Sequence, residues 1–128
     1  MAFELFVNGT LMRGLKLHDN MRNSEFLAEI RTAPCYRLHT IDDIHPGMYR
    51  LEEGEAGGTG ILGELYRVEE DVWQIIEAGE PPNLYRGLVE LEDGHEVLGI
   101  LYPRHLAEGK YPDISEYGGW HAYWATRS

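Results

Sequence analysis

Glu80 is the residue whose type and position most suggest chemistry, because it stands between Gly79 and the pair Pro81-Pro82. A residue before proline is pushed out of the helical region, so Glu80 should leave the preceding helix in an extended conformation. A carboxylate just beyond a helix C-terminus also feels the negative end of the helix dipole, at a cost of about 0.3–1 kcal/mol. This field raises the pKa of the carboxyl, which suits a general acid or base. We predict that Glu80 is catalytic; the other interpretation is a solvated acid, one of 22 Asp and Glu in the chain.

A second candidate is the turn Asn8-Gly9-Thr10-Leu11, which follows an apolar run at residues 3–7. Asn-Gly is a turn signal, so one interpretation is a plain hairpin turn. The other is a loop whose free backbone N–H groups meet an anionic ligand. This second interpretation predicts that residues 8–11 bind the substrate.

Other kinds of site find little support in the sequence. The six histidines show no metal-ligand spacing, so we expect no metal and no cofactor. No serine sits in a nucleophile elbow, and Cys35 lies in the middle of an expected strand, where a small core residue is the commoner role. The sequence therefore offers no convincing protein nucleophile.

Composition limits the partners and the location. A net charge of -11 argues against nucleic acid and against an anionic membrane surface. The N-terminus lacks a signal-peptide pattern, and no apolar run approaches the length of a membrane span. The single cysteine allows no disulfide within the chain, as is usual in a reducing compartment. We expect a cytoplasmic protein.

The spacing of apolar residues predicts the elements that position these candidates. Val72, Ile75 and Ile76 should form the buried face of a short helix that ends at Gly79. Asp93-Gly94 is the best hairpin signal, and residues 42–46 should form a loop. Strands are expected at residues 3–7, 26–32, 35–41, 47–51, 61–68, 84–91 and 96–102.

Several of these strands carry apolar residues on both faces, which suggests a closed or curled sheet. We therefore expect one α+β domain over residues 1–128, a small and mostly antiparallel β-barrel flanked by short helices. Glu64 lies among apolar neighbours in one strand. It is either exposed at a sheet edge or buried with a hydrogen-bond partner.

Three segments resemble the γ-glutamylcyclotransferase-like superfamily. FVNGTLMRG at residues 6–14 is similar to its strand-then-loop signature, and GELYRV at 63–68 to its central strand. IIEAGEPPNLYRGLVEL at 75–91 is similar to its acidic pair and the strand that follows. The resemblance implies that Glu80 is the catalytic glutamate and adds Tyr85 and Arg86 as substrate contacts. Asn8 replaces the usual aromatic residue, and Glu77 the usual aspartate.

A second resemblance covers nearly the whole chain. Blocks at residues 32–39, 46–51, 63–66 and 88–94, and the ending DISEYGGWHAY at 113–123, resemble the C-terminal domain of allophanate hydrolase, which has the same cyclotransferase-like fold. This implies a stand-alone relative of that domain and adds His121 as an anion contact. Arg13 and Arg37 are further candidates.

These resemblances leave three functions open. The first, ranked slightly ahead, is a transferase or lyase of small-molecule metabolism that cyclises a γ-glutamyl-amine to 5-oxoproline, with Glu80 as general acid/base. The second is an allophanate-branch activity that processes or decarboxylates a small carboxylated, urea-derived product. The third is a non-catalytic binding module that uses the aromatic tail at Trp120, Tyr123 and Trp124, although core packing is the favoured role of that tail. The implied partners are a small anionic metabolite and either a second copy of the chain or an amidase.

Overall fold

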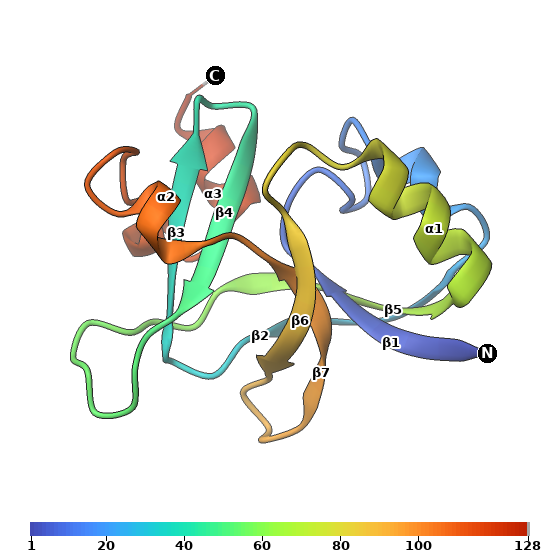
Figure 1. Cartoon of the computed structure of the whole chain (residues 1–128), viewed down its shortest axis with the longest axis horizontal. Coiled ribbons are helices and arrows are strands. Elements are labelled where there is room, and N and C mark those ends of the chain that lie inside the picture. The colour runs from blue at the N-terminus through green and yellow to red at the C-terminus, as the bar shows by residue number, and fades with distance from the viewer. Residues whose placement is uncertain (128) are drawn as a thin grey trace.

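The computed structural model describes residues 1–127, which form seven strands in two sheets together with short helices (Figure 1). The larger sheet has the strand order β2-β5-β1-β7-β6. Its β1–β7 pairing is parallel and its other pairings are antiparallel. Its strands are β1 (Ala2–Val7), β2 (Glu25–Arg31), β5 (Leu62–Glu69), β6 (Tyr85–Glu90) and β7 (Glu96–Leu101).

The smaller sheet is the hairpin of β3 (Tyr36–Ile41) and β4 (His45–Arg50), which stands at an angle to the larger sheet in Figure 1. The α+β class with mostly antiparallel strands is confirmed, but within residues 1–127 the sheets do not close into a barrel. Edge strands β2 and β6 approach each other only at one end, through the bridge between Thr32 and Leu91. Within residues 1–127 no strand ladder pairs β2 with β6, so the larger sheet stays open.

Helix α1 (Glu70–Gly79) packs beside β5 and the 3₁₀ turn η1 (His18–Met21). Its buried residues are Trp73 and Ile76, whereas Ile75 is 39% exposed. The prediction that Val72, Ile75 and Ile76 form the buried face was therefore partly wrong. Trp73 points inward, and its ring lies edge-on to that of Phe3.

Helices α2 (Arg104–Ala107) and α3 (Trp120–Ala125) lie beside the β3–β4 hairpin, on the other side of the molecule from α1 (Figure 1). A second 3₁₀ turn, η2 (Ser115–Tyr117), precedes α3. Trp120 and Tyr123 are buried, so the tail is largely core. None of the helices in the described part of the chain is both long and apolar enough to cross a membrane.

The turn between β3 and β4 is tighter than the loop expected at residues 42–46. Asp42 and Asp43 both have left-handed backbone angles, with φ of 57° and 58°, and the Ile44 N–H donates to the Ile41 carbonyl oxygen, as in a type I′ turn. Three residues, 42–44, connect the paired residues Ile41 and His45. The Asp43 carboxylate accepts hydrogen bonds from Thr40 and from the Tyr123 hydroxyl. As a result β4 begins at His45.

Candidate active site

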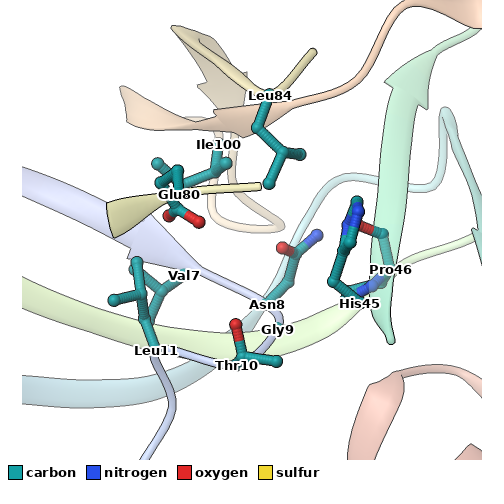
Figure 2. Close-up of a pocket in the computed structure, with 10 residues that line it drawn as sticks. All are labelled: Val7, Asn8, Gly9, Thr10, Leu11, His45, Pro46, Glu80, Leu84 and Ile100. Atoms are coloured by element: carbon teal, nitrogen blue, oxygen red, sulfur yellow. The ribbon is translucent and has the colours of Figure 1, made fainter. Parts of the chain in front are cut away.

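Glu80 leaves α1 in the extended conformation that its place before proline predicts, with φ -75° and ψ 145°. Gly79, the last helical residue, lies so close to Asn20 of η1 that an added Cβ atom would stand 2.7 Å from the Asn20 side-chain nitrogen. Glycine at this position thus lets the helix end pack against η1. Both features direct the Glu80 side chain toward the loop that follows β1 (Figure 2).

The structure brings Glu80 and residues 8–11 together around one small cavity, which we call the inner hollow (Figure 2). Its volume is about 20 Å³, enough for one ordered water or a group of similar size. Segments distant in the sequence form its walls: Val7 and residues 8–11, His45 and Pro46 of β4, Glu80, Leu84 and Ile100. The sequence left open whether Glu80 and residues 8–11 line one pocket, and in the structure they line the same one.

The Glu80 carboxyl lies in surroundings that disfavour its charged form. Burial raises the pKa of Glu80 to about 7. Within residues 1–127 the carboxyl forms no hydrogen bond and no ion pair that would offset this burial. The pKa of Glu80 is thus raised, as expected, but the cause is burial rather than the helix dipole. Near neutral pH the group can therefore both hold and release a proton.

A buried acid anchors the loop after β1. Glu64 is 4% exposed, and its carboxylate accepts bonds from the Arg13 backbone N–H at 2.9 Å, from Arg13 Nε at 3.1 Å and from the Tyr66 hydroxyl at 2.9 Å. Burial works to raise the pKa of Glu64, but these hydrogen bonds outweigh it and hold the pKa below its usual value. Of the two alternatives left open for Glu64, the buried and partnered acid is the one present.

Backbone N–H groups of the loop remain available for a ligand. Within the described residues, the N–H groups of Gly9, Thr10 and Leu11 donate no hydrogen bond. Gly9 lies against the Pro46 ring, where an added Cβ atom would come within 2.8 Å of two ring carbons. Glycine here allows the loop to approach β4 closely and to narrow the hollow.

His45 belongs to the hollow but was missed by the sequence analysis, which assigned it to a loop. It is 5% exposed, and its Nδ1 lies 2.9 Å from the Pro46 carbonyl oxygen. Burial lowers the pKa of His45, so the ring is neutral at physiological pH. Aspartate tolerates the left-handed backbone conformation of tight turns, so the Asp42-Asp43 pair could have indicated a short turn and an earlier start of the next strand.

A wider outer cavity adjoins the hollow. Its volume is about 230 Å³, and it shares Glu80, Leu84 and Ile100 with the inner hollow. Tyr85 lines this outer cavity and is half-exposed. Glu80 therefore stands between a space for a very small group and a space for a larger substituent.

Arg86 and His121 are not brought to the hollow. Arg86 pairs with Glu70 at 3.3 Å and lies over the rings of Trp73 and Phe3. It follows Tyr85 in β6, and successive strand residues face opposite sides. His121 is exposed on α3 and lines a separate cavity. The two other arginine candidates also have structural partners, since Arg13 binds Glu64 and Arg37 binds Asp113.

No metal-binding arrangement is present in the described part of the chain, where no three His, Cys, Asp or Glu side chains converge. The chemistry available in the hollow therefore consists of proton transfer by Glu80, anion binding by loop amides and hydrogen bonding by Asn8 and His45.

Comparison with known families gives one full-length match. The model of the allophanate hydrolase C-terminal domain matches residues 3–125. The chain belongs to this family. A comparison with curated proteins found no match.

Solved structures of the same fold include proteins of very different length. The uropathogenic E. coli-specific protein c4763 is 41% identical with a TM-score of 0.89, over 98% of this chain and 97% of that one. Kluyveromyces lactis allophanate hydrolase is 27% identical with a TM-score of 0.89, over 100% of this chain but only 22% of that one. A γ-glutamyl cyclotransferase, 14% identical with a TM-score of 0.55 over 88% of this chain and 70% of that one, shares the fold alone. Structures similar to this chain thus include part of a larger enzyme and a protein of about the same length.

Proposed function

We propose that this protein is an enzyme that removes CO₂ from a small N-carboxylated, urea-derived compound, with Glu80 as the proton donor. The observation that carries the proposal is the partly buried Glu80 carboxyl, without an internal partner, facing a loop of free N–H groups across a hollow of about 20 Å³. Membership of the allophanate hydrolase C-terminal domain family supports the substrate class. The hollow holds one small group of the substrate beside Glu80, and the adjoining outer cavity of about 230 Å³ holds the rest of the molecule.

In this reaction different residues bind the substrate, surround the leaving carboxylate and donate the proton. Loop N–H groups of residues 9–11 bind an anionic oxygen that the substrate keeps. The carboxylate that leaves lies against the apolar walls formed by Val7, Leu84 and Ile100, where its charge is poorly solvated. As the C–N bond breaks, its electron pair stays on nitrogen, and nitrogen takes the proton of Glu80. CO₂ departs, and Glu80 regains a proton from water.

Cyclisation of a γ-glutamyl-amine is the second candidate, and the outer cavity favours it. A volume of about 230 Å³ that shares Glu80 could hold the larger substrate. Here Glu80 acts first as base: it takes a proton from the substrate's α-amine, which attacks the γ-carbonyl. Glu80 then returns the proton to the leaving amine, so that 5-oxoproline and the free amine are released. The sequence alone ranked this reaction first; we place decarboxylation ahead of it because the chain belongs to the allophanate hydrolase C-terminal domain family.

The binding-module hypothesis loses its main support, because Trp120 and Tyr123 are buried and only Trp124 is half-exposed. An amidase remains a proposed partner, since in Kluyveromyces lactis this domain is part of the larger allophanate hydrolase. In the decarboxylation proposal that partner would release the carboxylated compound from allophanate. A second copy of the chain remains a proposed partner as well.

The pH dependence of the rate separates the two reactions, because they need opposite forms of the same group. Decarboxylation needs protonated Glu80, so its rate should fall as the pH rises through about 7. Cyclisation needs ionised Glu80, so its rate should rise over the same range. The first assay measures CO₂ release while an added amidase generates the substrate from allophanate; the second measures 5-oxoproline release from γ-glutamyl-amines.

Glu80→Gln should reduce the rate of the true reaction at least 100-fold, the lower range for loss of a general acid or base. Glu53→Gln is the matched control, because Glu53 is an exposed acid in the loop after β4. A Glu80→Gln variant as active as the wild type would remove Glu80 from the mechanism.

A further inference from the structure

Two buried polar side chains, Asn8 and His45, line the inner hollow, and each has one hydrogen-bonding atom that the protein does not use. Both are 5% exposed, which is unusual for side chains of this kind. They come from different sheets, Asn8 just after β1 and His45 at the start of β4. Figure 2 shows them side by side across from Glu80.

The contact with Met48 determines how the Asn8 amide is oriented. Asn8 Nδ2 lies 3.1 Å from the Met48 sulfur. A thioether sulfur can only accept a hydrogen bond, so the atom beside it must be the nitrogen. The Asn8 oxygen therefore points the other way, and Figure 2 shows it on the side toward Glu80. No described residue donates to this oxygen, which is not sealed from the hollow.

The Pro46 carbonyl determines the tautomer of His45 in the same way. A carbonyl oxygen only accepts, so His45 Nδ1, at 2.9 Å from it, must carry the proton. In the neutral ring Nε2 is then an acceptor. Within residues 1–127 no group donates to Nε2, and it too is not sealed in protein.

The inner hollow thus offers two kinds of contact. The loop N–H groups donate, whereas Asn8 Oδ1 and His45 Nε2 accept. A ligand with only carboxylate oxygens would satisfy the donors and leave both acceptors unpaired. A ligand that also carries an N–H group would pair with them.

We infer that Asn8 and His45 are specificity-determining residues that select a carboxylated amide, whose N–H groups donate to Asn8 Oδ1 and His45 Nε2, over an acid or ketone of the same shape. This inference rests on the proposed function for the anion-binding loop, and it adds the nitrogen side of the substrate. It accounts for two acceptor atoms, carried by buried side chains, that neither Glu80 nor the loop amides use.

Oxamate and pyruvate test the inference, since both are small monocarboxylates that differ only by NH₂ in place of CH₃. Their dissociation constants are measured by NMR titration of the full chain. Oxamate should bind on the order of 10- to 100-fold more tightly, because the methyl group of pyruvate displaces water from the two acceptors and donates no hydrogen bond in its place. The ¹⁵N resonance of His45 Nε2 should shift with oxamate and not with pyruvate.

Two variants remove one acceptor each while keeping the side-chain shape. His45→Phe and Asn8→Leu should each reduce the preference for oxamate, whereas Glu53→Gln should preserve it. If either variant fails to fold, the affinities of the wild type for oxamate and pyruvate and the His45 resonance still test the inference. Equal affinity for both ligands would overturn the inference and leave the anion-binding loop intact. If neither ligand binds, the loop assignment in the proposed function fails, and this inference fails with it.

Discussion

Replacing Glu80 with glutamine should stabilise the protein, and the gain should grow as the pH rises. Glu80 has a pKa of about 7 in the folded protein, against an ordinary value of 4.5. Between these values the folded state holds a proton that the unfolded chain has released, so the stability of the wild type falls with rising pH. The loss of unfolding free energy reaches its full value, about 3 kcal/mol, above pH 7. Glutamine is neutral throughout and avoids this cost.

Urea denaturation followed by tryptophan fluorescence at pH 5, 6, 7 and 8 measures the effect, with Trp73 of the neighbouring helix as a buried probe. The difference in unfolding free energy between Glu80→Gln and the wild type should widen by about 2–3 kcal/mol from pH 5 to pH 8. Glu53→Gln should follow the wild type at every pH, because Glu53 is exposed. A difference between Glu80→Gln and the wild type that does not change with pH would mean that Glu80 ionises as an ordinary surface acid. The acid/base proposal would then lose its physical basis.

Two further substitutions test how the site is held and what lies outside it. Glu64→Gln should destabilise the protein by about 1–3 kcal/mol at pH 7, because a neutral amide replaces the acceptor of three hydrogen bonds from Arg13 and Tyr66; an unchanged urea midpoint would contradict this. Arg86→Met should leave KM unchanged and cost less than about 1 kcal/mol, since Arg86 pairs with Glu70 at the surface. A tenfold rise in KM would instead place Arg86 in the substrate site.

Local sequence rules succeeded where a conformation depends on near neighbours. The extended backbone of Glu80 followed from Pro81, and the hairpin of β6 and β7 followed from Asp93-Gly94. The turn at Asp42 and Asp43 was mistaken for a longer loop, and for this reason His45 was left out of the site. Whether the sheet closes also could not be predicted from the sequence, because the alternation of residues along a strand does not indicate whether two distant edge strands will pair.

From sequence alone, the family, the α+β class and the backbone direction of Glu80 could be read, because each depends on motifs or on steric effects between adjacent residues. Tertiary structure alone decided that Glu80 is partly buried, that Asn8 and His45 face the same hollow, and that Arg86 and His121 do not. A pKa and a binding site depend on which distant groups exclude water from one another. Those distances are set by the packing of β1, β4 and the end of α1, which no short stretch of the chain encodes.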